Sequence, residues 1–186
     1  MNPKAYIHPQ ALVDDAVQLG DDTKVWAFAQ IMNGVTVGDN CSISGGCFLE
    51  GGCNIGSRVT IKNGCLIWDG VSIANDCFIG PNVTFTNDKE PRSPRMELAR
   101  ERYSQPENWR VETQIEQGVS IGAGSIILPG VRIGEYTLIG AGSLITKDVP
   151  SHSLCYGYPA KPMGKVCKCG KRKNNESHCE KCGYQF

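Results

Sequence analysis

The sequence places a large apolar residue at every sixth position from Ile7 to Phe85. The same count resumes, on the same phase, from Ile115 to Ile145. A helix repeats about every 3.6 residues and a half-buried strand every second residue, so neither explains this spacing. Stacked six-residue rungs of a parallel β-helix do explain it, and we predict an all-β fold of that kind.

A second, small or β-branched position lies four residues after nearly every apolar site. Two inward positions per rung predict a thin, solid core, and three rungs predict one triangular coil. Half of the ten cysteines fall on this small position: Cys41, Cys47, Cys53, Cys65 and Cys77. We interpret them as core thiols, which favours a reducing compartment such as the cytoplasm.

The repeat is interrupted between Phe85 and Ile115 by a polar segment with three prolines, six basic and six acidic residues. Because the phase recovers, we predict that residues 86–114 leave the prism as a loop while the coils on either side stack. A loop of this length is typical of a functional segment. The alternative is a solvated insertion with no role.

These patterns predict a β-helix domain at 1–150, a terminal cap at 151–166 and a cysteine-rich tail at 167–186. The chain has 19 basic and 19 acidic residues and a formal net charge of zero. It contains no apolar run of membrane length and no signal-peptide pattern at its start. We therefore expect a cytoplasmic protein that has neither a nucleic acid nor a membrane as its partner.

The tail carries two cysteine pairs, Cys167 with Cys169 and Cys179 with Cys182, each followed directly by a glycine. Such turns can aim two thiolates at one point, and four thiolates suit tetrahedral zinc. We predict a zinc-ribbon-like site. His178 could replace one thiolate, and a redox pair or an unstructured tail are the alternatives.

Sorting the rungs by threes gives three columns of residues that directly follow the apolar positions. One column is mostly glycine, and a second mixes His8, Trp26, Ser44 and Lys62 with glycines. The third column contains no glycine and reads Asp14, Met32, Glu50, Trp68, Thr86, Leu128 and Thr146.

Polar residues gather along the third column. Asp69 and Asn87 are eighteen residues apart, which stacks one above the other at a strand spacing of about 5 Å. With Glu50 and an exposed Trp68 they predict a patch that could bind a sugar ring or a base at the mouth of the long loop. The alternative is that these residues only contact a neighbouring subunit.

The Ile-Gly rungs and the closing run IGAGSLITKDVPSHSLCYGYPAK at 139–161 resemble the left-handed β-helix acyltransferases of the hexapeptide-repeat superfamily. Within it, WDG at 68–70, GPNVTFTND at 80–88 and PRS at 91–93 resemble the nucleotide-sugar 3-N-acetyltransferases. The resemblance implies a homotrimer with active sites between subunits. It also implies transfer from acetyl-coenzyme A to a 3-amino sugar on UDP or dTDP, as in surface polysaccharide (O-antigen) biosynthesis.

The resemblance also implies roles for single residues. Asn87 matches the family's key asparagine, and we expect Asp69 to help it orient the sugar amine. We expect Trp68 and Lys62 to contact the nucleotide, and Arg92 a phosphate or carboxylate. The implied coenzyme-binding residues are Gly122, Ala123, Gly140, Ala141, Gly142, Lys147, Ala160 and Lys161. The WDG and NVTFTND motifs resemble the dTDP branch and the cysteine tail the UDP branch, so the nucleotide stays open.

The three histidines, His8, His152 and His178, all lie outside the middle coils. Acetylating a hydroxyl needs a general base, whereas an amine with a pKa near about 8 is already partly free, so an amine acceptor is favoured. A sugar O-acetyltransferase would need His152, or His8 from a partner subunit. A non-catalytic metal-binding β-helix resembling γ-type carbonic anhydrases is a weaker alternative, because such enzymes hold their metal with mid-coil histidines.

Overall fold

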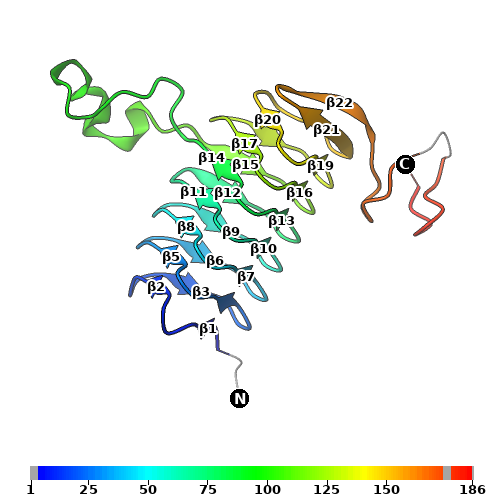
Figure 1. Ribbon diagram of the computed structural model, residues 1–186, viewed down its shortest axis with the longest axis horizontal. Coiled ribbons are helices and arrows are strands. Elements are labelled where there is room, and N and C mark those ends of the chain that lie inside the picture. Colours follow the sequence, from blue (N-terminus) through cyan, green and yellow to red (C-terminus); the bar gives the residue numbers. More distant parts are fainter. Residues whose placement is uncertain (1–3, 174–176, 186) are drawn as a thin grey trace.

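The chain folds, as predicted, into a parallel β-helix. The computed structural model describes residues 4–173 and 177–185, so residues 1–3, 174–176 and 186 of the predicted segments lie outside the described part. Three sheets enclose one core, and the coils stack from the N-terminal to the C-terminal end of a prism (Figure 1).

Each sheet takes every third strand of the chain. Sheet 1 contains β1 (Tyr6–Ile7), β4 (Lys24–Val25), β7 (Ser42–Ile43), β10 (Thr60–Ile61), β13 (Phe78–Ile79), β16 (Ser120–Ile121), β19 (Leu138–Ile139), β21 (Ser153–Gly157) and β22 (Ala160–Lys165). Sheet 2 contains β2 (Leu12–Val13), β5 (Gln30–Ile31), β8 (Phe48–Leu49), β11 (Leu66–Ile67), β14 (Thr84–Phe85), β17 (Ile126–Ile127) and β20 (Leu144–Ile145). Sheet 3 contains β3 (Gln18–Leu19), β6 (Thr36–Val37), β9 (Asn54–Ile55), β12 (Val71–Ile73), β15 (Thr113–Ile115) and β18 (Arg132–Ile133).

The turns between the sheets form three edges. The Trp26 edge joins sheets 1 and 2 at residues 26–28, 44–46, 62–64, 80–82, 122–124 and 140–142. The Asn87 edge joins sheets 2 and 3 at residues 32–34, 50–52, 68–70, 86–88, 128–130 and 146–148. The third edge joins sheets 3 and 1.

Both predicted inward positions fill the core. Every sixth residue from Val25 to Phe85 and from Ile115 to Ile145 is buried, as are the small positions from Thr23 to Val83 and from Thr113 to Val149. Ile7 remains 44% exposed, because no coil covers the N-terminal end. The five core cysteines are buried and unbridged, as predicted.

Most of these three-residue turns place their last residue in the left-handed backbone region. Glycine, asparagine or aspartate usually occupies this position, as Gly64 and Asn40 do, because these residues tolerate a positive φ. Four bulky residues also adopt it: Phe28 (φ 64°), Arg58 (φ 58°), Tyr136 (φ 54°) and His152 (φ 58°).

The long insertion leaves and rejoins the prism without disturbing the stacking. Ile73 pairs with Ile115 and Phe85 with Ile127 across it, which confirms the predicted recovery of phase. Its outer part is an arm with three short 3₁₀ helices, η1 (Glu97–Ala99), η2 (Arg102–Ser104) and η3 (Pro106–Asn108), which projects from the coils (Figure 1).

The cap is a hairpin that extends sheet 1. β21 pairs in parallel with β19 and antiparallel with β22, and Cys155 lies opposite Ile139 as a buried thiol. The tail then folds back on the last turn, where the Val166 N–H donates to the His152 carbonyl at 2.8 Å. No helix among residues 4–173 and 177–185 is long and apolar enough to cross a membrane.

The buried thiols lead to a prediction. Burial raises the pKa of Cys53 to about 12 and that of Cys77 to about 11. A hydrogen bond with Cys65 lowers the pKa of Cys47, but the coils shield all five sulfurs from solvent. We expect iodoacetamide at pH 8 to leave all five core cysteines and Cys155 unmodified in the native protein and to modify them after denaturation. Mass spectrometry of tryptic peptides checks this; labelling of the core thiols in the native state would contradict the packing.

Candidate active site

Asp69 and Asn87 lie on consecutive turns of the Asn87 edge, as the register predicted. The Asn87 side-chain amide donates to the Asp69 main-chain carbonyl at 3.1 Å. The Glu50 carboxylate accepts from the Asp69 N–H at 2.9 Å. The same contact recurs between Asp14 and the Asn33 N–H. We infer that Glu50 supports the turn beneath the site, so its predicted substrate contact is not needed to explain its position.

The carboxylate of Asp69 is held by an arginine that sequence reasoning missed. Arg110 Nη1 lies 3.0 Å from both Asp69 carboxylate oxygens, and both side chains are mostly buried. The Asp69 carboxylate raises the pKa of the Arg110 guanidinium above its ordinary value. Arg110 ends the arm, and the next residue, Val111, donates its N–H to the Asn87 carbonyl at 2.9 Å. The exit of the arm thus fixes both polar residues of the site.

Trp68 is less exposed than predicted. Its ring is partly buried against the core and packs on Phe48 with ring centroids 5.4 Å apart. The expectation of an exposed tryptophan was wrong, because the register places Phe48 beside it on the preceding coil. Trp68 therefore offers less ring surface to a nucleotide than the sequence indicated.

The arm is anchored at its start by Asp88. Arg102 and the Tyr103 hydroxyl both bind the Asp88 carboxylate, with distances of 2.6 and 2.5 Å. These donors hold the pKa of the Asp88 carboxyl well below its usual range. An ionised carboxylate therefore keeps the base of the arm in place next to Asn87.

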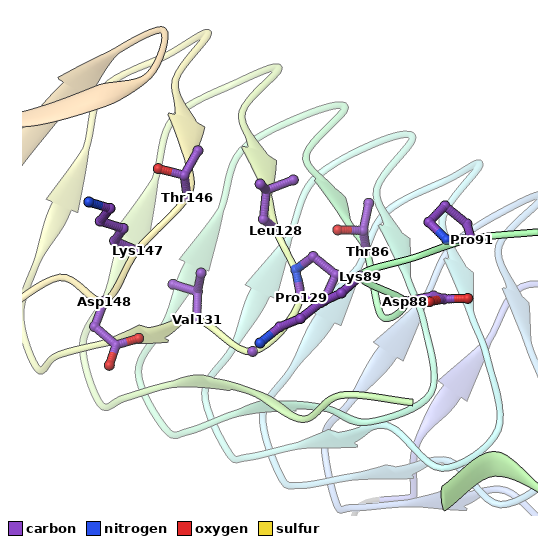
Figure 2. Close-up of a pocket in the computed structure, with 11 residues that line it drawn as sticks. Thr86, Asp88, Lys89, Pro91, Leu128, Pro129, Val131, Thr146, Lys147 and Asp148 are labelled. Carbon is purple, nitrogen blue, oxygen red and sulfur yellow. The ribbon is translucent and has the colours of Figure 1, made fainter. Parts of the chain in front are cut away.

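A groove of about 830 Å³ lies along the Asn87 edge toward the C-terminal end. Figure 2 shows its lining residues. Thr86 and Asp88, which flank Asn87, lie at one end, Lys147 at the other, and Leu128 and Pro129 between them. The lining residues are Thr86, Asp88, Lys89, Pro91, Leu128, Pro129, Gly130, Val131, Thr146, Lys147 and Asp148. The middle of the groove is apolar, and the ammonium groups of Lys89 and Lys147 belong to its lining. Such a groove suits a long acyl carrier that bears phosphates.

Lys89 is a second cation of this groove that the sequence reasoning did not select. Its chain lies across the turn at Pro129 (Figure 2), within 3.2 Å of where a side chain on Gly130 would begin. The only signal in the sequence was the position of Lys89 at the start of the insertion. Lys147 was predicted for the coenzyme, and the structure places it in the same groove.

The glycines predicted for the coenzyme have a structural reason of their own. A Cβ on Gly122 would lie 2.4 Å from the Ala141 nitrogen, and one on Gly140 would lie 2.7 Å from the Tyr156 side chain. Ala123, Ala141 and Gly142 are exposed in the same turns of the Trp26 edge. Ala160 shares a small cavity of about 230 Å³ with Lys147, and Lys161 is exposed on β22.

Two predicted substrate residues do not join the patch around Asn87. Lys62 lies on the Trp26 edge, across sheet 2 from Asp69, and lines a separate groove. Arg92 is exposed on the arm, where its guanidinium donates to the Pro91 carbonyl at 2.8 Å. Both contacts with substrate stay predictions.

Histidines lie away from Asn87 in the described residues. His152 is held between the rings of Tyr136 and Tyr184, with centroids 5.3 and 5.6 Å away, and its Nδ1 lies 3.1 Å from the Val166 carbonyl. His8 lines the groove at the Trp26 edge. The Asn87 patch thus offers an amide and a carboxylate rather than an imidazole.

The tail cysteines come together as predicted. The sulfurs of Cys167, Cys169, Cys179 and Cys182 all lie within 4.8 Å of one another. Gly170 and Gly183 have positive φ and donate N–H groups to the carbonyls of Cys167 and Cys179, so each pair forms a tight turn. His178 is exposed and does not belong to this cluster.

Comparisons with known proteins agree with this fold. The family "Bacterial transferase hexapeptide (six repeats)" matches residues 16–51, 52–87 and 112–147. A dTDP-3-amino-3,6-dideoxy-alpha-D-galactopyranose 3-N-acetyltransferase from Aneurinibacillus thermoaerophilus is 44% identical over 184 residues, which cover 97% of this chain and 90% of that protein. A galactoside O-acetyltransferase from Lactococcus lactis is 52% identical over only 52 residues, 28% of this chain and 25% of that protein.

A solved structure shares the fold. It is a variant of perosamine N-acetyltransferase from Caulobacter crescentus in complex with CoA and GDP-perosamine, with a TM-score of 0.53 and 23% identity. The match covers 88% of this chain but 58% of that one, so the chain spans little more than half of its length. The repeat, the prism and these matches show that the chain belongs to the bacterial transferase hexapeptide-repeat family.

Proposed function

We propose that this protein transfers the acetyl group of acetyl-coenzyme A to the 3-amino group of a dTDP-linked 3-amino-deoxysugar. The observation that carries the proposal is the place of Asn87, beside Asp69 at one end of a groove lined by Lys89 and Lys147. The near full-length relative that acts on a dTDP-3-amino sugar supports dTDP over UDP. The CoA complex of the structural neighbour fits the expected cosubstrate.

In this proposal the site works by positioning. Asn87 and Asp69 orient the neutral sugar amine against the thioester carbonyl, and the groove holds the acyl chain. The amine lone pair attacks the carbonyl carbon, and the resulting oxyanion accepts hydrogen bonds from the Asn87 amide or a main-chain N–H. The C–S bond then breaks, and the departing thiolate takes the proton lost by the amine, directly or through water.

The O-acetyltransferase alternative has weaker support. A hydroxyl acceptor needs a base. His152 is engaged in the cap by two rings and a carbonyl, and His8 lies on the Trp26 edge, away from the Asn87 of its own chain. The galactoside O-acetyltransferase match covers only a quarter of that protein. We further propose that the product enters surface polysaccharide synthesis and that the reaction takes place in the cytoplasm, where the core thiols stay reduced.

Replacing Asn87 tests the site. We expect Asn87→Ala to lower turnover of a dTDP-3-amino sugar by about 10²-fold or more, the size of one lost positioning or oxyanion contact. Asn33→Ala is a matched control, since Asn33 is exposed at the same turn position on the same edge. Steady-state kinetics measure both, and size-exclusion chromatography checks that assembly is unchanged.

His152→Ala separates the two acceptor classes. We expect it to retain most of the activity, because His152 lies in the cap. An inactive His152→Ala together with a near-normal Asn87→Ala would instead indicate a hydroxyl acceptor activated by histidine.

We propose that the active enzyme is a homotrimer. Leu98 on the arm is 94% exposed, and Leu12 and Phe78 are exposed on sheets 2 and 1; in a trimer these side chains would contact neighbouring subunits. Sedimentation equilibrium at micromolar concentration should give the mass of three 20.2-kDa chains. A stable monomer that remains active would exclude a site shared between subunits.

We also propose that the tail binds one zinc ion through its four cysteines. Thiolates around tetrahedral zinc lie about 3.8 Å apart, given Zn–S bonds of about 2.3 Å. The sulfurs of Cys167 and Cys182 are 3.4 Å apart and those of Cys169 and Cys179 are 3.7 Å apart, so the donor set fits. The cluster faces the cap rather than Asn87, so its metal would supply structure and not chemistry.

Elemental analysis of freshly purified protein should therefore find about one zinc per chain. Cys179→Ser should remove most of it, whereas His178→Ala should keep it, because His178 is outside the cluster. Metal removal should expose the tail to proteolysis, since a polar segment this small needs its metal to stay folded. Less than about half a zinc per chain in untreated protein would count against the site.

A further inference from the structure

The Trp26 edge carries a groove that the acetyl-transfer site does not use. It has a volume of about 910 Å³ and lies on the N-terminal half of the prism. Its polar and aromatic lining includes His8, Trp26, Phe28, Ser44, Lys62 and Asn63. The C-terminal half of the same edge, at 122–124 and 140–142, carries only glycine and alanine. The N-terminal and C-terminal halves of this edge therefore suit different ligands.

Phe28 occupies the groove in an unfavourable backbone conformation. Its φ of 64° lies in the left-handed region, where a bulky side chain is strained, and the residue is 64% exposed. Tyr136 has the same conformation, but its ring packs on His152. Among residues 4–173 and 177–185 no other aromatic ring packs on Phe28, and its large exposed fraction leaves little contact with the protein to offset the strain. A strained, exposed aromatic ring indicates a ligand contact.

Trp26 provides a second ring in the same groove. It is 43% exposed, and its indole N–H donates to the Ser42 hydroxyl at 3.2 Å. Tyr6 packs edge-on against it at a centroid distance of 5.8 Å. These contacts fix the ring while leaving part of it open, which suits stacking with a planar base.

Charge in the groove favours an anion. Lys62 contributes an ammonium group, and neither aspartate nor glutamate is among the lining residues. The groove along the Asn87 edge differs, because Asp88 and Asp148 accompany its lysines. The hydroxyl of Ser44 adds a hydrogen-bond donor beside Lys62, and the Asn63 amide, which donates to the Gly45 carbonyl at 3.2 Å, has a second N–H.

We propose that this groove binds the nucleoside diphosphate portion of the nucleotide-sugar substrate. The base stacks between Phe28 and Trp26, and Lys62 contacts the diphosphate. This inference rests on the proposed function and moves the nucleotide ring from Trp68, which is partly buried against Phe48, to the opposite edge of sheet 2.

A trimer connects this groove to Asn87. Cyclic symmetry joins two different surfaces of the same chain, so the Trp26 edge of one subunit can face the Asn87 edge of the next. Lys62 and Asp69 follow consecutive strands, β10 and β11, and therefore lie in the same coil. A nucleotide held by Lys62 then directs its sugar toward the Asp69 and Asn87 of the neighbouring subunit at the same height along the prism.

Phe28→Gly tests the groove in the full-length protein. Glycine accepts the positive φ without strain, so thermal stability should be kept or raised. We expect the KM for the dTDP-amino sugar to rise at least 10-fold, with kcat changed less than about 2-fold. Calorimetric titration with dTDP alone should show a matching loss of affinity, and Lys62→Met should weaken the same binding.

Arg58→Gly is the matched control. Arg58 has the same turn conformation on the third edge, so this variant should bind dTDP like the wild type. Titration with coenzyme A should be unchanged in Phe28→Gly, because the groove is assigned to the sugar nucleotide.

Three outcomes would overturn the proposal: wild-type dTDP affinity in Phe28→Gly, loss of coenzyme A binding instead of dTDP binding, or dissociation into monomers. The last would make Phe28 a subunit contact. If the wild type binds dTDP through Phe28 yet acetylates no amino sugar, the groove stands and the proposed reaction fails.

Discussion

Backbone hydrogen bonding between coils eighteen residues apart is the constraint on which the rest of this structure depends. Each strand has only two or three residues in most rungs, so a strand is stable only when the coils above and below pair with it. This ladder forces equivalent residues into columns. It also fixes where chemistry can lie: inward positions are filled by the core, and the edges carry side chains that are free to vary.

The ladder explains why a long insertion can carry function without harming the fold. The arm leaves after Asn87 and returns at Arg110, and the Asp88 and Arg110 main chains form an antiparallel bridge at its base. Two ion pairs, Asp88 with Arg102 and Asp69 with Arg110, then fasten it to the edge. Asp69, Asp88 and Arg110, which hold the arm, also lie next to Asn87. The conformation of the arm therefore affects the shape of the site.

The features that follow from the six-residue period were predictable, and those that depend on the arm were not. The period gave the core, the recovery of phase and the stacking of Asn87 on Asp69. Arg110 lies in a segment without a repeat, so no register could place its guanidinium on Asp69. The burial of Trp68 depends on Phe48, an outward residue of the preceding coil. The columns compared only the residue that directly follows each apolar position, so they did not include Phe48.

The positions of the histidines bear on both chemistry and assembly. His152 joins the last turn of the prism to the tail, lying between Tyr136 of the coils and Tyr184 beside the cysteine cluster. An imidazole used in this way fastens the tail to the cap. Neither His152 nor His8 lies beside the Asn87 of its own chain, which favours an acceptor that needs no strong base, as a sugar amine is. A metal in the tail would stiffen the end of the prism without taking part in acetyl transfer.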